Sequence, residues 1–156
     1  MIGLLLIAHA PLAQALVDCA YHVYGCDPGH CAQTLALDVA PAETVDQLLP
    51  RAATLAAGLD SGAGVLVLTD LFGATPANLA SQLARPGKVE VVCGVNLPMV
   101  MRALSYRSSM PLPLLVEKVM SGAAAGVIKI ASNAPQNQQQ TFADPGHASA
   151  RMFDHQ

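Results

Sequence analysis

Short apolar runs alternate with longer segments of mixed polarity along most of the chain. Runs of this length are typical of strands that are buried on both faces of a sheet. They occupy residues 2–8, 34–39, 64–69 and 89–95. The segments between and after them have a helix-like pattern and predict helices at about 12–24, 42–59, 76–84, 97–106 and 113–123. Pro50 lies inside the second of these, so we expect a kink or a break there.

Strands that alternate with helices predict a parallel sheet, and right-handed crossovers place helices on both of its faces. The expected fold is therefore α/β, a three-layer, doubly wound, mainly parallel sheet with strand order 2-1-3-4. A fifth run, residues 127–131, alternates in polarity after Gly126 and predicts an antiparallel edge strand. From residue 132 the chain becomes polar, so we expect one domain over 1–131 and a disordered tail over 132–156.

Composition narrows the classes of function. The 156 residues are 53% hydrophobic and 12% charged, the net charge is −3, and the eight Lys and Arg are scattered, which argues against a nucleic-acid partner. The apolar N-terminus imitates a secretory signal, but it lacks a basic region in front. No apolar run approaches the roughly 20 residues that span a bilayer. We expect a cytoplasmic protein, at most peripheral to a membrane, whose four cysteines are free thiols.

Two residues at strand ends could carry chemistry. His9 ends the first predicted strand, and Asp70 ends the third. If these strands are neighbours, the two ends lie about 5 Å apart. A carboxylate that accepts a hydrogen bond from one imidazole nitrogen leaves the lone pair of the other nitrogen free for nucleophilic attack. The alternatives are a loop histidine bonded to backbone and an aspartate that caps a loop.

The segment after Asp70 is suited to an anion. Gly73 permits a tight turn, Thr75 can cap the next helix, and Pro76 fits the first helical position. Backbone N–H groups at a helix start favour a phosphoryl group. We therefore expect Gly73, Ala74 and Thr75 to form a phosphate cradle beside His9.

Three segments, LLLIAHAPLA, LTDLFGATPAN and GVNLPMVMRAL, resemble the signatures of the mannose-class (mannose/fructose/sorbose) enzyme IIA family of the bacterial sugar phosphotransferase system. The resemblance covers about residues 1–131. It implies that His9 accepts a phosphoryl group from phospho-HPr on Nε2 and passes it to an enzyme IIB, that Asp70 holds Nδ1, and that Thr75 helps to hold the phosphoryl group. It also implies a homodimer in which the last strand joins the partner's sheet. The partner-docking residues it suggests are Phe72, Asn96, Leu97, Pro98 and Met99.

The sequence departs from the family pattern at two places. Ala10 follows the histidine where Gly is usual, and Gly73-Ala74-Thr75 replaces the usual Gly-Gly-Ser turn. No IIB domain follows within the sequence, so the acceptor is expected to be a separate chain. This leaves open a regulatory module that binds partners according to the phosphorylation of His9.

Three other hypotheses compete with this one. A phosphoryl donor to a dihydroxyacetone kinase has a similar domain. A flavodoxin-like nucleotide binder is disfavoured because the turn AHAPLA lacks glycines. A zinc site could form from four residues with soft or borderline ligand atoms, although their spacing fits no familiar finger. They are His22, Cys26, His30 and Cys31. We expect neither a metal nor a cofactor.

Overall fold

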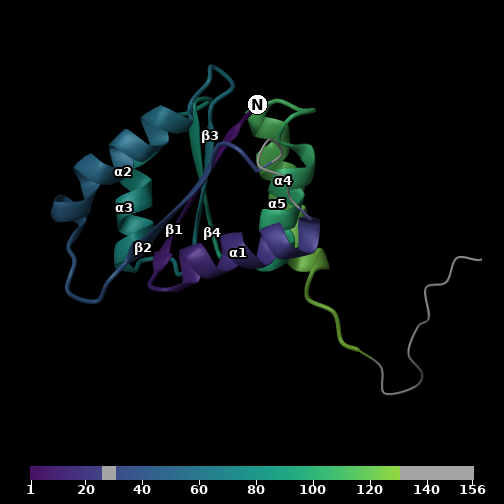
Figure 1. Ribbon diagram of the computed structural model, residues 1–156, viewed down its shortest axis with the longest axis horizontal. Helices are drawn as coiled ribbons and strands as arrows, with labels where there is room; N and C mark the ends of the chain where they lie inside the picture. The colour runs from purple at the N-terminus through teal and green to yellow at the C-terminus, as the bar shows by residue number, and fades with distance from the viewer. Residues whose placement is uncertain (26–30, 131–156) are drawn as a thin grey trace, which may run out of the picture.

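The fold is built on one sheet of parallel strands (Figure 1), in a computed structural model that describes residues 1–25 and 31–130. The strands are β1 (Gly3–His9), β2 (Thr34–Val39), β3 (Val65–Thr69) and β4 (Val89–Cys93). Their order is β2-β1-β3-β4, and Ile7 on β1 pairs with Leu37 on one side and Thr69 on the other. The predicted parallel sheet and its order are confirmed.

Helices cover both faces of this sheet. They are α1 (Leu12–Tyr24), α2 (Val45–Leu59), α3 (Thr75–Leu83), α4 (Leu97–Tyr106) and α5 (Leu112–Ala125). Helices α2 and α3 lie on one face, and α1, α4 and α5 lie on the other (Figure 1). The predicted three-layer α/β architecture is confirmed, and α2 continues through Pro50 without the break that the sequence suggested.

The side chains of β1 separate the core into two halves. Leu4 and Leu6 pack in the cluster with α1, α4 and α5, whereas Leu5 and Ile7 pack in the cluster with α2 and α3. Successive strand residues point to opposite faces of a sheet. His9 continues the odd-numbered series, so its side chain leaves the strand on the α2/α3 side.

Arg107, which follows α4, lies at the other edge of the sheet, beside the starts of β1 and β2. Its guanidinium donates to the carbonyl oxygens of Gln33 (3.1 Å) and Ala32 (2.8 Å) and to Oγ1 of Thr34 (2.8 Å), while the side chain is 2% exposed. Burial lowers the pKa of Arg107, although the nearby Tyr21 and Tyr24 raise it. A buried guanidinium is tolerated here because backbone and hydroxyl oxygens accept its hydrogen bonds.

Two sequence expectations about the periphery are wrong. Residues 127–130 form no strand within this chain; they follow α5 as an extended segment in which Val127 is 82% exposed and Ile130 is 90% exposed. Polar and apolar residues do alternate here, but the alternation does not specify which strand the segment would pair with. The cysteines also differ, because Cys31 is in a disulfide bond, while Cys19 and Cys93 are free. Residues 131–156, with the predicted tail, lie outside the described residues.

None of the described helices combines the length and apolar character needed to cross a membrane.

Candidate active site at the carboxyl edge of the sheet

His9 is held in place by its neighbours on both sides. Its backbone N–H donates to Oδ2 of Asp70 at 2.9 Å, and the next backbone N–H, that of Ala10, donates to the carbonyl of Val39 at 3.0 Å. One hydrogen bond reaches the β3 side and the other reaches β2. The backbone at the end of β1 is therefore held on both sides before any contact of the His9 side chain is counted.

The imidazole of His9 meets the carboxylate of Asp70, as the sequence predicts. Nδ1 lies 2.7 Å from Oδ2, and the side chains are 49% and 12% exposed respectively. Oδ1 of Asp70 accepts from the backbone N–H of Leu71 at 2.8 Å. Burial raises the pKa of Asp70, but the hydrogen bonds from the His9 backbone, the His9 ring and the Leu71 backbone outweigh it, so the pKa lies below its ordinary value.

This geometry fixes the chemistry of the ring. An ionised carboxylate can only accept a hydrogen bond, so Nδ1 carries a proton, and in the neutral ring Nε2 keeps its lone pair. Half of the His9 side chain is exposed, so the ring is open to a reacting group from outside. A positive charge that develops on the ring is balanced by a carboxylate that is already in contact.

Helix α3 begins beside this pair, though one residue earlier than the sequence suggested. The N-cap is Ala74 rather than Thr75, which is the first helical residue, and no side-chain hydrogen bond caps the helix. Gly73 makes the turn with a φ of +83°, which only glycine adopts freely. The N–H of Ala74 donates to the carbonyl of Leu71 at 3.2 Å. Within the described parts of the chain, the backbone N–H groups of Gly73 and Thr75 have no acceptor.

Asp38, at the end of β2, is a functional candidate that the sequence reasoning missed. Its Oδ1 accepts from the N–H of Ala13 at 2.8 Å and of Gln14 at 3.4 Å, so it caps α1 from a neighbouring strand. Pro11, the N-cap of that helix, supplies no side-chain bond. An aspartate at the carboxyl end of an apolar strand, next to a helix start, was the available signal.

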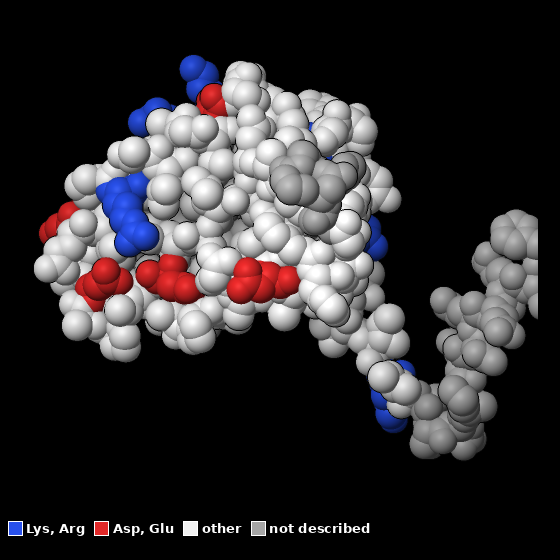
Figure 2. All heavy atoms as spheres, in the orientation of Figure 1, with Lys and Arg blue, Asp and Glu red and all other residues white. Residues whose placement is uncertain are grey.

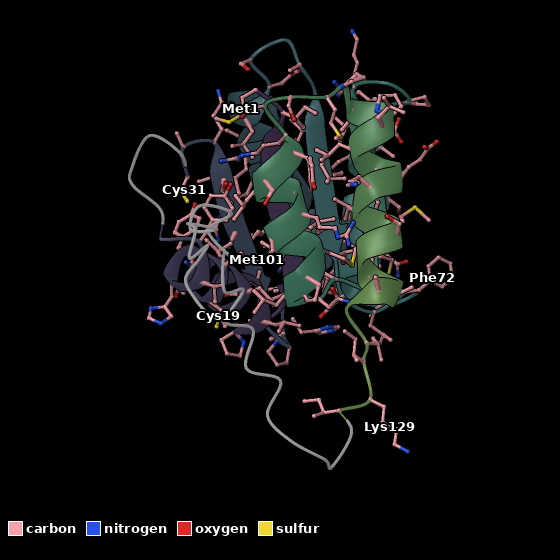
Figure 3. The ribbon with its side chains drawn as sticks, turned by 90° about the vertical axis from the view of Figure 1, so that its right-hand side faces the viewer. Met1, Cys19, Cys31, Phe72, Met101 and Lys129 are labelled. Carbon is pink, nitrogen blue, oxygen red and sulfur yellow. The ribbon has the colours of Figure 1, made fainter. Side chains whose placement is uncertain are left out.

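The predicted docking residues fall into two groups. Phe72 is 87% exposed and projects away from the body of the molecule (Figure 3). Leu97 and Pro98 are half-buried. Asn96 caps α4, accepting from the N–H of Met99 at 3.0 Å. Met99 itself is 1% exposed and belongs to the core, so its expected contact with a partner is wrong: the helix turns it inward.

The charged side chains visible along this edge are acidic. In Figure 2 acidic side chains lie along the lower side of the molecule, where the strands end, and the basic side chains visible on that face stand apart from one another. The described residues contain no group of three acidic, histidine or cysteine side chains placed to hold a metal ion. Of the four residues considered for zinc, Cys26 and His30 lie outside the described residues, and the sulfur of Cys31 is in a disulfide.

Fold and site together define a class: a parallel α/β protein that presents an exposed histidine, oriented by a carboxylate, at the carboxyl edge of its sheet. The model of one family, PTS system fructose IIA component (EIIA-man), matches residues 3–120. The chain belongs to this family. Membership supports a phosphotransfer role in a sugar phosphotransferase system.

Known proteins and structures agree with this assignment. The mannose-specific EIIAB component of Escherichia coli (strain K12) is 36% identical over 76 residues, which are 48% of this chain and 24% of that protein. The chain thus matches about a quarter of that relative's length. The sorbose-specific EIIA component of Lacticaseibacillus casei is 28% identical over 120 residues, 75% of this chain and 82% of that one. The mannose/sorbose specific IIA subunit from Enterococcus faecalis shares the fold, with a TM-score of 0.73 at 20% identity over 86% of this chain and 98% of that chain.

Proposed function

We propose that this protein accepts a phosphoryl group from phospho-HPr on Nε2 of His9 and donates it to an enzyme IIB on a separate chain. The contact between Nδ1 of His9 and Oδ2 of Asp70 is the observation that carries the proposal. It leaves one ring nitrogen nucleophilic, and it places a carboxylate where the ring becomes positive. The proposal locates this exchange in the cytoplasm and requires neither metal nor cofactor.

The transfer is a displacement at phosphorus. The lone pair of Nε2 forms the new P–N bond while the bond from phosphorus to the donor's histidine nitrogen breaks and returns its electron pair to the donor. The Nδ1 proton stays between the ring and Asp70 throughout, so the phosphorylated ring is a cation paired with a carboxylate. The acceptor then reverses the step. Positioning and electrostatics supply the rate enhancement.

The start of α3 is proposed to hold the phosphoryl oxygens. His9 leaves β1 on the α2/α3 side, and the N–H groups of Gly73 and Thr75 have no acceptor in the described part of the chain. Both groups lie where the helix dipole favours an anion. The Thr75 hydroxyl adds a third donor, whereas Ala74 contributes through the turn, since its N–H is already bonded.

Radioactive labelling tests the assignment. Incubation with phosphoenolpyruvate, enzyme I and HPr should place one acid-labile phosphoryl group on the protein, and His9→Ala should abolish it. His22→Ala is the matched control, because His22 is an exposed histidine on α1, away from Asp70. Full labelling of the His9→Ala variant refutes the proposal. Transfer from the labelled protein to an enzyme IIB, rather than to a dihydroxyacetone kinase subunit, tests the acceptor.

A homodimer completes the proposed assembly. Val127, Ile128 and Ile130 are exposed on a segment that pairs with none of the described strands. Strand β4 pairs only with β3 among the described strands, so its other edge is open to a strand from outside. Sedimentation equilibrium should find a dimer, and Ile128→Lys should weaken it; a wild-type monomer at high concentration contradicts this part of the proposal.

A further inference from the structure

A cavity of about 440 Å³ lies between α2, α3 and the start of β4. None of its lining residues belongs to the site around His9, and its end at Val89, the first residue of β4, lies at the edge of the sheet opposite His9. Four residue steps along β4 span roughly 13 Å. The volume is within the range of small-molecule sites, about 300–1,000 Å³.

The cavity exists because one face of α2 carries small side chains. Leu49, Ala53, Ala56 and Asp60 follow one another at helical spacing along this face, and Ala57 lies beside them. Alanines cannot fill the space up to α3, so a hollow remains. From Leu49 to Asp60 the helix rises about 16 Å, which makes the cavity an elongated groove.

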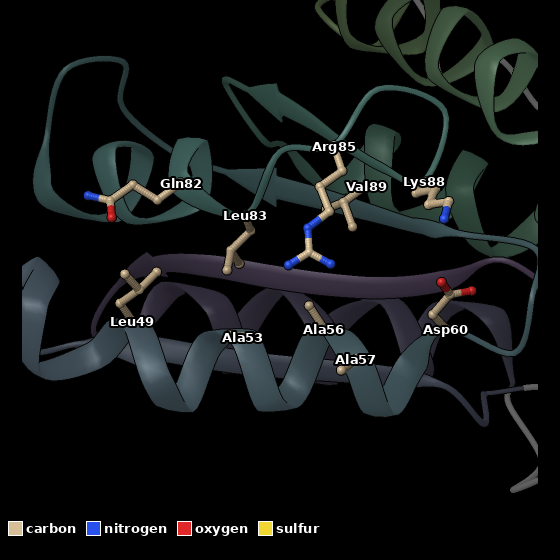
Figure 4. Close-up of a pocket in the computed structure, with 10 residues that line it drawn as sticks. All are labelled: Leu49, Ala53, Ala56, Ala57, Asp60, Gln82, Leu83, Arg85, Lys88 and Val89. Atoms are coloured by element: carbon tan, nitrogen blue, oxygen red, sulfur yellow. The ribbon is translucent and has the colours of Figure 1, made fainter.

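The two ends of the groove differ in polarity (Figure 4). Leu49, Leu83 and the polar Gln82 flank one end, Lys88 and Asp60 lie at the other, and the Arg85 side chain extends between these ends toward α2 near Ala56. A ligand that matches this groove therefore has an apolar body and one charged head.

A tight turn presents the two cations. The backbone N–H of Arg85 donates to the carbonyl of Val89 at 2.9 Å, the N–H of Val89 returns a bond of 2.8 Å, and Gly87 takes a φ of +75° between them. Neither the Arg85 nor the Lys88 side chain forms an ion pair or hydrogen bond within residues 1–25 and 31–130. Both charges are therefore available to an anion.

Asp60 does not neutralise this end. Its Oδ1 accepts from the backbone N–H groups of Gly62 at 2.9 Å and Gly64 at 3.0 Å, so the carboxylate holds the loop that precedes β3. Two cations against one engaged carboxylate leave an excess of positive charge. The guanidinium of Arg85 can bind a carboxylate or a phosphate with two parallel hydrogen bonds.

We propose that this groove binds a small organic anion with an aliphatic body: the anionic head on Arg85 and Lys88, and the chain along Ala53 toward Leu49 and Leu83. Two classes of ligand have this combination of an anionic head and an apolar chain: aliphatic carboxylates and alkyl phosphates. The site is independent of the phosphoryl-transfer site, so a failed labelling experiment leaves it intact.

Titration of the full chain with straight-chain carboxylates, followed by ¹⁵N NMR, tests the proposal. Butanoate, hexanoate and octanoate should cause saturable shifts at the amides of Ala53, Ala56 and Arg85, and each added CH₂ should tighten binding by up to about fourfold. A parallel titration with octyl phosphate compares the two head groups, and the ligand with the higher affinity identifies which class of anion the groove prefers. Octanol, which lacks the charge, should bind at least about tenfold more weakly than octanoate.

Matched variants locate the ligand. Arg85→Gln should weaken octanoate binding by about tenfold or more, whereas Arg51→Gln, an exposed cation on α2 outside the groove, should not. Ala53→Phe should block binding, because Ala53 is exposed and lines the groove, while Thr54→Phe, one residue further and outside it, should leave binding intact. Dispersed spectra of each variant show that it has folded.

Three results overturn the proposal. The first is an absence of saturable shifts, or shifts that lie elsewhere on the protein. The second is equal binding of octanol and octanoate, which removes the role of the cations. The third is a loss of octanoate binding when the protein dimerises, which would show that a second copy of the chain covers the groove.

Discussion

Replacing Asp70 by Asn removes the charge of the carboxylate and turns one acceptor oxygen into an NH₂ group, which cannot accept from the Leu71 N–H as Oδ1 does. The amide is nearly the same size, and its oxygen can still accept from Nδ1 of His9, which lies 2.7 Å from Oδ2. What is lost is the interaction between a carboxylate and a ring that becomes positive as the P–N bond forms. Hydrogen bonds to charged groups contribute about 1.5–3 kcal/mol, and Asp70 is only 12% exposed, so solvent screens little of this. We therefore expect phosphoryl transfer to slow by roughly 10- to 150-fold.

Rapid-quench measurement of transfer from labelled phospho-HPr gives this rate directly. Asp46→Asn, which removes an exposed carboxylate in the first turn of α2, is the control and should transfer at the wild-type rate. Circular dichroism and urea unfolding should show that both variants fold. A rate for Asp70→Asn within about twofold of wild type would refute the reasoning, because it would mean that the charge does not stabilise the transition state.

Other changes test separate parts of the structure. The pKa of Asp70 is lowered in the folded protein, so the carboxylate stabilises the fold fully above the ordinary aspartate pKa of about 3.9. This contribution is lost as the pH falls through the lower pKa of the folded state. Urea unfolding should therefore show that the difference in free energy of unfolding between wild type and Asp70→Asn shrinks only below the ordinary pKa. Asp38→Ala should lower the free energy of unfolding by about 1 kcal/mol, because α1 loses its cap, and an unchanged urea midpoint would contradict this. Arg107→Met should cost about 3 kcal/mol, since it leaves buried oxygens without a donor; a thermal melt like that of wild type would show that water replaces it. Phe72→Ser should leave stability within about 0.5 kcal/mol while raising the KM for phospho-HPr, because this side chain is almost fully exposed; an unchanged KM would remove Phe72 from the docking surface.

The sheet could be predicted from sequence because of how it is buried. The residues of β1 and β3 are covered on both faces, so nearly every position is apolar, and the runs are visible without any tertiary information. The contact between His9 and Asp70 followed from the same logic, since adjacent parallel strands bring their ends together. The local sequence pattern was therefore enough to predict the central strands and the proximity of His9 and Asp70 at the edge of the sheet.

Features that depend on distant partners could not be found in this way. The alternation at residues 127–130 is typical of a strand, but these residues pair with none of the described strands, and the pattern does not specify a pairing partner. The cap that Asp38 gives to α1 joins residues 25 positions apart, so the position of Asp38 at a strand end suggests a role there but does not identify which helix it caps. The spacing of the cysteines did not reveal that Cys31 forms a disulfide. Met99 was misplaced because motif position does not tell which way a helix turns its side chains.

One oxygen of Asp70 accepts from both the backbone and the ring of His9. The backbone N–H holds Oδ2 within reach of the ring, and rotating the imidazole breaks the bond from Nδ1. The ring is thereby confined to one rotamer before a donor arrives, and little entropy is lost on encounter. In the proposed transfer, the adjustment that brings phosphorus into line with Nε2 is therefore expected to come from the donor protein.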